Sequence, residues 1–578
     1  MSIRTNKMKA IHVLLKQLIT ARRKFHERGR DESFDAKLEK LRLDVNKIED
    51  VFVRVKKNEE ELLDTLAEVY DHLHKLDRRK LDEDMDDICK RIRDSAHKLL
   101  PMDGFHDSSK EEDHNGGQKF HSSQQLQQPL QKKWTWTDYH RLDSLPKDIM
   151  KTLLIFPENA VIRKRNLINL WIGEGVVEGT ENKIAEKLGE DLIDELLCSK
   201  VILRYGNGKG PSINKFRILP DFRRQMELFV TRKDVHHDGY IFRVSPFRNT
   251  RLNWLKLEQK EVTLGDWYFD YSIHIIFNVG ASYLNFRPQW VKKFLNLEVL
   301  QLGRWQDSPL HHIEVGSEEF LKELRNLTQL KYLSLRGISR IFNIPSFIAQ
   351  LERLLILDLK ACHNLETLPN DISSMKSLTQ LILSECYLLE GMPKGIEKLK
   401  NLEVLKGFVI STPAKTPCKI SDLVNLEKLK RLSIYIGSEV VIRDWEFESL
   451  EHIPTLEHLK ISWSGSDPWS GSFRLHFPPN LRKLHLECFP GQSLGEFLFN
   501  MRYWEKDMEL NITGGKLESM KVDFEWKYVR VLRLKYLKQL NVDIDNFKSF
   551  FPRLKYAEIK QVSNHKEYEW IESMNGLI

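Results

Sequence analysis

LERLLILDLKACHNLETLPNDI, residues 351–372, decides the fold of this 578-residue chain. Its apolar residues follow a fixed order: a short Leu-x-Leu strand, an inward-turning Cys362, a further leucine, and an apolar residue before Pro369. Two neighbouring stretches, 327–348 and 375–396, follow nearly the same order. One such unit cannot bury its leucines alone, whereas stacked units build a continuous core. These stretches therefore predict a solenoid of repeats.

Eleven such cores stand in phase from Leu300 to Ile559, most of them within the roughly 20–29 residues that separate leucine-rich repeats. Side chains alternate along a strand, so the residue between the two leucines faces the concave side of the sheet. The eleven residues at this position are polar, apolar and of both charges, which suits a protein partner better than a uniform polyanion. The alternative that they only face solvent stays open. We expect partner contacts at Gln301, Ser334, Asp358, Ile382, Lys406, Ser433, Lys460, His485, Asn511, Arg533 and Glu558. The four basic members of this set, in the C-terminal half, could meet an acidic partner.

The first hundred residues are expected to be helical. From Leu38 to Leu76 a three-four spacing of apolar residues is broken only at Glu59, which is typical of helices packed as in a coiled coil. The pattern predicts a helical bundle or coiled-coil domain over 1–100, within one chain or between chains. Residues 101–133 are rich in Ser, Gln, His, Gly and Asp, and their composition predicts a flexible polar linker.

Residues 134–235 are compact and mixed. Three short helices are expected, the second with Leu167, Leu170 and Trp171 on one face, followed by a hairpin whose turn contains three glycines. Three helices and a hairpin are the plan of a winged helix. Residues 236–290 would then connect this domain to the solenoid at 291–578. The fold class is thus multidomain α plus α/β: helical bundle, winged helix and leucine-rich-repeat solenoid.

Two stretches carry a family resemblance. LIFPENAVIRKRNLINLWIGEGVV, at 153–177, has a Phe-Pro-Glu turn before a helix that ends in Leu-Trp-Ile-Gly-Glu-Gly, and MPKGIEKLKNLEVLKGFVIS, at 392–411, lies among the repeats. In both, the chain resembles the plant coiled-coil nucleotide-binding leucine-rich-repeat disease-resistance proteins, of the RPP13-like type. The resemblance implies an intracellular defence protein with a winged helix joined to recognition repeats.

Two departures from that family change the expectation. The family places a P-loop ATPase module between its N-terminal helices and its winged helix, but here some 45 residues separate the two segments, and nothing in the chain reads GxxxxGK[S/T]. The family's Met-His-Asp motif matches Leu219-Pro220-Asp221, without the histidine. We therefore expect a form that lacks the nucleotide-binding module, with no cofactor and no enzymatic activity.

Composition indicates a cytoplasmic protein. No apolar run approaches the ~18 residues of a membrane span, and six widely spaced cysteines favour a reducing compartment. Residues 1–26 carry basic residues and no acid, so an amphipathic helix there could lie on the inner face of the plasma membrane. The scattered histidines lack the spacing of metal ligands, so no metal site is expected.

Three functions remain open. The preferred hypothesis is a defence protein whose repeats bind an effector or host protein, and which acts as an adaptor, decoy or modulator without its own ATPase switch. Its helices would self-associate or pair with another resistance protein. The second is an autonomous resistance protein that signals through those helices. The third, from another class, is a winged-helix nucleic-acid binder using Arg163, Lys164 and Arg165, which the sequence favours least.

Overall fold

The computed structural model describes residues 147–180, 184–205, 213–230, 234–237, 240–243, 254–265, 273–306, 313–411, 417–437, 444–464, 474–495, 497–499, 505–520, 526–541, 550–560, 562 and 568–571, with separate positions between 14 and 92. The predicted linker at 101–133 lies outside these residues, as does most of the apolar spacing between Leu38 and Leu76.

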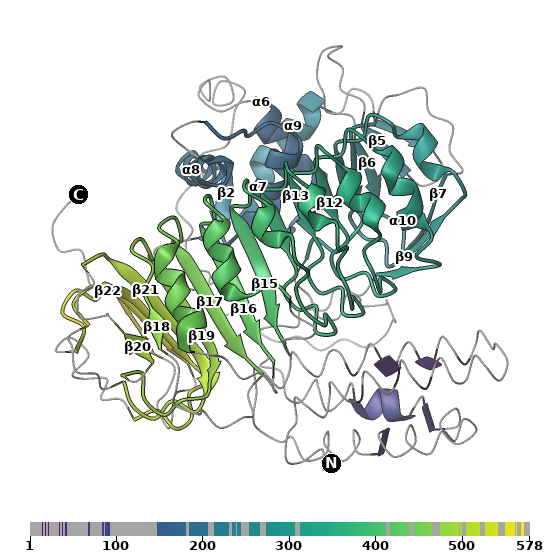
Figure 1. Ribbon diagram of the computed structural model, residues 1–578. Coiled ribbons are helices and arrows are strands. Elements are labelled where there is room, and N and C mark those ends of the chain that lie inside the picture. Colours follow the sequence, from purple (N-terminus) through teal and green to yellow (C-terminus); the bar gives the residue numbers. More distant parts are fainter. Residues whose placement is uncertain are drawn as a thin grey trace.

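One curved sheet of 16 strands runs through the described part of the solenoid (Figure 1). Neighbouring strands are parallel from β6 to β23, and the two ends are closed by antiparallel strands. In spatial order the strands are β4 (Asp234–His237), β5 (Tyr240–Arg243), β6 (Trp254–Leu257), β8 (Ile275–Asn278), β10 (Val299–Gln301), β12 (Tyr332–Ser334), β13 (Ile356–Asp358), β14 (Gln380–Ile382), β15 (Val404–Ile410), β16 (Arg431–Ile436), β17 (His458–Trp463), β19 (Lys483–Phe489), β21 (Met508–Gly515), β22 (Val529–Lys535), β23 (Tyr556–Lys560) and β24 (Tyr568–Ile571). The parallel sheet thus begins at β6, before the boundary at residue 291 that the leucine spacing predicts, because β6 and β8 lack its full pattern.

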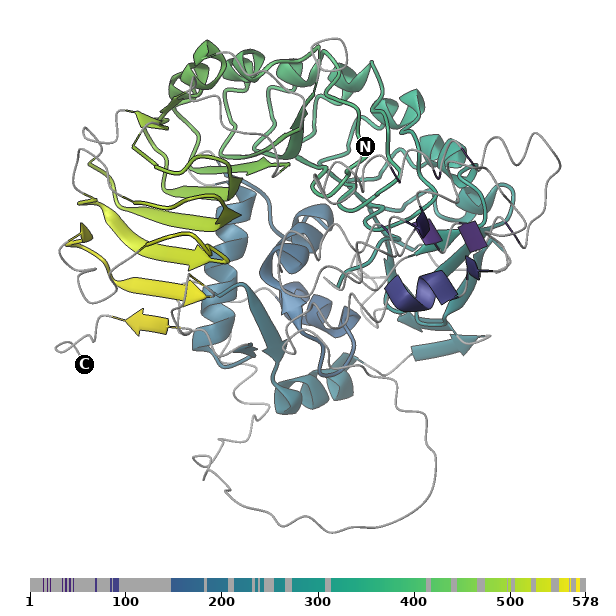
Figure 2. The same cartoon turned by 90° about the horizontal axis from the view of Figure 1, so that it is seen from below.

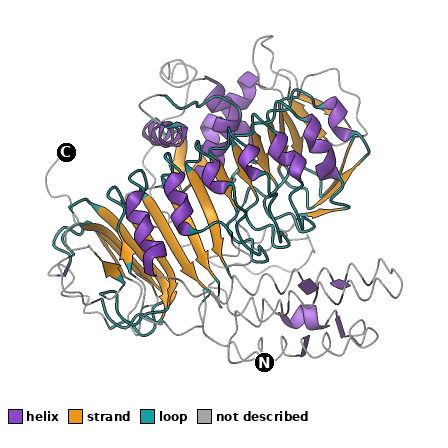
Figure 3. Ribbon diagram, viewed as in Figure 1, coloured by secondary structure: helices purple, strands orange, loops and turns teal. Residues whose placement is uncertain are grey.

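Short helical turns return the chain along the outer side of the sheet (Figure 3). Each follows a strand and a turn, and apolar residues such as Ile348 and Ile372 anchor it in the core. These turns are η4 (Trp290–Lys293), α10 (Phe320–Glu323), η5 (Leu324–Asn326), η6 (Ser346–Gln350), η7 (Ile372–Ser374), η8 (Ile396–Lys398), η9 (Ile420–Asn425), α11 (Asp444–Glu448) and η10 (Ser449–His452). Two small parallel sheets complete the solenoid: β7 (Glu261–Leu264), β9 (Tyr283–Phe286) and β11 (Glu314–Val315), and β18 (Leu475–His476) with β20 (Leu498–Phe499).

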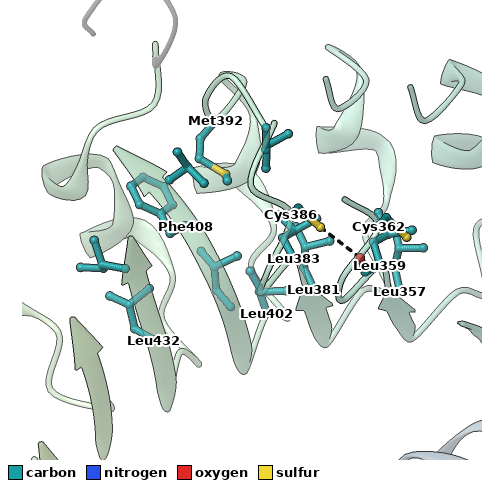
Figure 4. Packing of buried hydrophobic residues seen from close by; sticks show 14 of the residues in the cluster. Leu357, Leu359, Cys362, Leu381, Leu383, Cys386, Met392, Leu402, Phe408 and Leu432 are labelled. Carbon is teal, nitrogen blue, oxygen red and sulfur yellow. Dashed lines mark hydrogen bonds between the residues drawn. The ribbon is translucent and has the colours of Figure 1, made fainter. Parts of the chain in front are cut away.

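The leucines stack as the repeat pattern predicts (Figure 4). Leu357 lies opposite Leu381 in the neighbouring strand, and both are buried. Cys362 and Cys386 also turn inward, where their thiols donate hydrogen bonds to the carbonyls of Leu335 and Leu359 at 3.1 and 3.0 Å. Each carbonyl also accepts a backbone N–H bond, from Ile338 and Cys362 respectively, so the thiols add a second bond inside the core.

One core position differs from the expected alignment. The Leu405/Gly407 pair takes the place of Leu-x-Leu in β15, but Gly407 is an extra residue in the ladder, since Lys406 pairs with Ser433 and Phe408 with Ile434. Phe408, fully buried, fills the place that the second leucine occupies elsewhere. The bulge is built on the positive φ of Gly407, +81°.

The winged helix forms a compact unit of its own. It comprises α6 (Lys147–Thr152), η2 (Leu153–Ile155), β1 (Ile162–Arg163), α7 (Lys164–Gly173), α8 (Ala185–Cys198), β2 (Ile202–Arg204), β3 (Lys215–Ile218) and α9 (Pro220–Val230). β3 pairs antiparallel with both β1 and β2, which confirms the predicted hairpin. Leu167, Leu170 and Trp171 are fully buried, as their shared face on the helix predicts.

The described positions of the first hundred residues are helical, and their apolar side chains, such as Leu41 and Ile88, are buried. Arg91 pairs with Glu68 at 2.8 Å, which joins two stretches that are well separated in the sequence. Arg42 is nearly buried and contributes, after burial and Arg304, to lowering the pKa of His363 to about 3. Arg42 of the N-terminal segment therefore lies near enough to His363 of the repeats for their charges to interact.

Candidate functional site

The winged helix lies in the hollow of the solenoid (Figure 2). Its core and the concave side of the first strands form one continuous apolar cluster. From the sheet this cluster contains Trp254, Ile275, Phe277, Val299, Trp305, Tyr332 and Ile356. The approach is close, because a Cβ added at Gly173 of α7 would meet the Cβ of Tyr332 at 2.5 Å. Nearly all of the concave side from β6 to β13 is therefore covered from within the chain.

Polar contacts fix the orientation of this packing. Lys256 of β6 donates from Nζ to the carbonyl of Leu154 at 2.8 Å, in a buried position. Asn166 of α7 donates to the carbonyl of Trp305 and accepts from Arg336 at 3.3 Å. Each bond satisfies a group that the apolar contact would otherwise leave unpaired, so the polar groups set one orientation.

A cluster of charged side chains lies at the edge of the covered part of the face. We call it the clasp: Lys164 and Arg165 of α7, Glu186 and Glu190 of α8, and Arg431 of β16. Arg431 donates to Glu186 at 2.7 Å and to Glu190 at 3.4 Å, and Arg165 pairs with the same two carboxylates. Lys164 reaches Glu190 at 3.4 Å.

The pKa values of the clasp residues reflect how closely these charged side chains are packed. Burial raises the pKa of Glu190, but Arg165, Lys164 and Arg431 outweigh it and leave the pKa below its usual range. Burial, followed by the nearby Arg431, lowers the pKa of Arg165 to about 9. The Glu190 carboxylate is thus held ionised between three basic side chains.

One row of the sheet shows where the cover ends. Positions that pair across successive strands read Val299, Tyr332, Ile356, Gln380 and Val404, and then Arg431, His458, Lys483 and Glu509. The row is mostly apolar under the winged helix and charged beyond it. Large apolar residues at concave positions were the signal in the sequence that this part of the face is covered.

The structure places the eleven predicted contact residues in two groups. Gln301, Ser334, Asp358 and Ile382 are buried, with exposed fractions of 3, 0, 5 and 6%. Ser334 and its neighbours on β10 and β13 lie on the part of the sheet that the winged helix covers, so they cannot meet a partner in this conformation. In the second group Asn511 is buried and the other six are half-buried: Lys406, Ser433, Lys460, His485, Arg533 and Glu558.

Three carboxylates organise the second group. Glu487 pairs with Lys460 at 2.7 Å, and Glu509 pairs with Lys483 at 2.6 Å and with Arg533. Glu558 pairs with Lys535 at 2.6 Å and with Arg533 at 3.3 Å. His485 lies 3.2 Å from the hydroxyl of Thr513.

The sequence predicts only part of this network, because only the residue between the two leucines of each strand was considered as a contact residue. The C-terminal strands are longer, and alternation brings positions two residues either side of the central one to the same face. Lys483, Glu487, Glu509 and Lys535 follow from that rule.

Comparison with known proteins agrees with this architecture. Residues 277–561 match the leucine-rich repeat region family, and residues 155–218 match the winged helix domain of disease resistance proteins. In both regions the chain is similar to plant disease-resistance proteins. It is 28% identical over 445 residues to disease resistance RPP13-like protein 4 of Arabidopsis thaliana, which covers 72% of the chain and 48% of that protein. It is 27% identical to disease resistance protein RGA4 of Oryza sativa over 36% of the chain and 20% of that protein.

The matched part of the chain thus spans about half the length of the Arabidopsis relative, and less of the rice relative. Among solved structures, a leucine-rich-repeat protein of Leptospira interrogans is 20% identical, with a TM-score of 0.30 over 50% of the chain and 68% of that protein.

The winged helix of this chain carries charges that do not suit nucleic acid. Lys164 and Arg165, two of the three residues predicted to contact phosphates, are engaged by Glu190. α8 adds Asp191, Asp194 and Glu195 to the two acids of the clasp. Phosphates would meet carboxylates on this helix, which opposes the electrostatic attraction that drives nucleic-acid binding.

Metal binding and membrane insertion are two further functions to consider for the part of the chain that the structure describes. Within it, no group of three or more His, Cys, Asp or Glu side chains is arranged to hold a metal ion. No helix of the described residues has the length and hydropathy of a membrane span. The remaining candidate site is the uncovered part of the concave face.

Proposed function

We propose that the chain is an intracellular plant defence protein that binds a protein partner on the concave side of β16–β23. It acts as an adaptor, decoy or modulator and has no ATPase switch of its own. The observation that carries this proposal is the division of the face: the winged helix covers β6–β13, while charged, half-buried side chains line β16–β23. Similarity to disease-resistance proteins supports the role in defence.

The test uses the full chain, tagged and purified from infected leaf tissue. Ser433→Trp and Thr513→Trp place a large side chain on the uncovered face and should abolish recovery of a specific co-purifying protein. Ser374→Trp, on the outer turn η7, is the matched control and should retain it. A protein recovered equally with all three variants would contradict the proposed binding face.

The switchless part of the proposal has its own test. No stretch of the chain reads as a phosphate-binding loop, so calorimetric titration with ATP or ADP should show no saturable binding. Stoichiometric nucleotide binding at micromolar concentrations would contradict it.

The autonomous alternative is favoured by one observation: Arg42 of the N-terminal segment lies near enough to His363 for its charge to contribute to lowering the pKa of that imidazole. N-terminal helices held there could signal when released. Expression of residues 1–100 alone in leaf tissue separates the two functions. Cell death would favour autonomous signalling, and its absence would favour the adaptor function.

A further inference from the structure

Basic side chains predominate on the uncovered concave strands. We call this surface the basic face and define it by six residues: Lys406, Arg431, Lys460, Lys483, Arg533 and Lys535. Their strands are neighbours in the sheet, from β15 to β22. Within the described strands β15–β23, the carboxylates that share the face are Glu487, Glu509 and Glu558, fewer than the bases.

The acids of the face are already engaged. Glu509 and Glu558 each pair with two bases, and Glu487 also accepts a hydrogen bond from Ser462 at 2.8 Å. The positive charge is therefore not balanced within the face, and carboxylates from outside would add favourable contacts rather than replace equivalent ones.

Lys406 shows the excess of positive charge most clearly. Burial, followed by Arg165, Arg431 and Lys360, lowers the pKa of its ammonium to about 7, and Asp358 opposes this only in part. On β17, two strands along the sheet, burial with Arg431, Arg165, Lys483 and Lys406 lowers the pKa of His458 to about 2. Burial first, and then the surrounding cations, thus disfavour the charged forms of these two basic groups.

The clasp shows which chemistry this surface accepts. α8 presents Glu186 and Glu190, one turn apart on an acidic helix, and both contact Arg431 at the edge of the basic face. This contact is an intramolecular example of carboxylates bound by the concave strands. Lys483 lies in the same register row as Arg431, and Lys406, Lys460 and Arg533 share the next row on this face.

We infer that the partner segment recognised by the basic face is an acidic peptide, whose carboxylates extend across β15–β22 the contacts that Glu186 and Glu190 make with Arg431. The inference rests on the proposed function and names the chemistry of the partner. Because Arg431 belongs to both surfaces, such a peptide competes with α8 for it and weakens the clasp as it binds.

Binding is also linked to protons. Carboxylates placed near Lys406 favour its charged form and raise its pKa from about 7, so the complex takes up a proton at neutral pH. Affinity should therefore rise as the pH falls from about 8 to about 6.5, a range in which the carboxylates of a peptide stay ionised.

The experiment uses the full chain and a fluorescein-labelled peptide of alternating glutamate and serine, with fluorescence anisotropy as the readout. The peptide with glutamine in place of glutamate should bind far more weakly. Lys460→Glu and Lys535→Glu should each weaken binding about tenfold, equivalent to about 1.4 kcal/mol, and Lys460→Gln by less. Lys398→Glu, on the outer turn η8, is the matched control and should leave binding unchanged.

Three results would overturn the inference. The glutamate peptide binds no better than its glutamine counterpart; Lys398→Glu weakens it as much as Lys460→Glu does; or an oligothymidylate of equal charge binds as tightly, which would indicate a general polyanion surface. A natural partner lost with Ser433→Trp but retained with Lys460→Glu would also overturn it while leaving the proposed function intact. Melting curves of the variants show that each is folded.

Discussion

Gly407 shows how a single residue can be required by the backbone rather than by its side chain. The repeat pattern predicts a core leucine at this position, and a glycine there looks like a defect. The structure gives the physical reason, because the bulge needs both a positive φ and a close approach to β14. Phe408 restores the lost apolar volume one residue later.

Replacing Gly407 by alanine should therefore destabilise the centre of the solenoid. An added Cβ would lie 2.5 Å from the carbonyl carbon of Leu383, and the left-handed conformation alone costs about 1–3 kcal/mol. Gly514→Ala is the matched control, since its φ is also positive, +65°, but the nearest atom would be 3.6 Å away. Urea unfolding of both variants measures the difference, and an equal loss in the two would contradict a steric role for the close approach.

The Trp171 indole carries a second prediction at this scale. Its N–H donates to the Thr152 hydroxyl at 2.7 Å, and this hydroxyl donates in turn to the carbonyl of Ile149 at 2.7 Å, all in buried positions. Thr152→Val keeps the shape but removes both bonds, which should cost about 1–3 kcal/mol because the indole N–H stays buried and unpaired. Faster hydrogen exchange in α7 would show the loss, whereas Thr152→Ser should retain wild-type protection.

At the scale of elements, the clasp decides how firmly the winged helix is held. Glu186 is only 2% exposed, and breaking a buried ion pair by changing one partner costs about 3–5 kcal/mol. Arg431→Glu should therefore raise hydrogen exchange in α8 and on the concave strands beneath it. Adding Glu186→Arg should restore part of the protection, and a double variant as exposed as the single one would argue against the pairing.

Lys406 of β15 makes the stability of the folded chain depend on pH. The unfolded chain holds the proton of this lysine up to about pH 10.4, whereas the folded chain releases it near pH 7. Stability of the wild type should then rise between these two values, because the unfolded state binds more protons there.

Lys406→Met removes this penalty. The variant should be more stable than the wild type below pH 7, by about 2–4 °C in Tm for each kcal/mol gained, and the gain should vanish near pH 10.4. Lys406→Arg, which stays charged, should show neither the gain nor the slope with pH. Thermal melting across this range checks both variants, and a gain independent of pH would contradict the lowered pKa.

At the scale of the whole molecule, local patterns predicted the elements better than their arrangement. Alternation around Leu-x-Leu identified which residues face the hollow, since it depends only on neighbours in the strand. Whether they meet solvent depends on contacts such as Gly173 with Tyr332, which lie far apart in the sequence. Ser334 and Ser433 occupy the same place in their repeats, yet the winged helix buries only the first.

The same distinction between local pattern and long-range packing explains which charged contacts could be predicted. Lys460, His485 and Arg533 were recognised as basic positions on the concave face, but their pairing with neighbouring acids follows from the lengths of the strands and their register. The clasp could not be predicted, because Glu186 and Arg431 belong to different domains and only the packed fold brings them together.

The account rests on the division of the concave face between the winged helix and the free strands. Ser334→Cys and Ser433→Cys test it most directly, because each places a thiol at the same position of a repeat with little change in size. Maleimide labelling followed by peptide mass spectrometry should modify Cys at 433 quickly and leave Cys at 334 protected until the chain is unfolded. Equal labelling of the two positions in the folded chain would contradict the account.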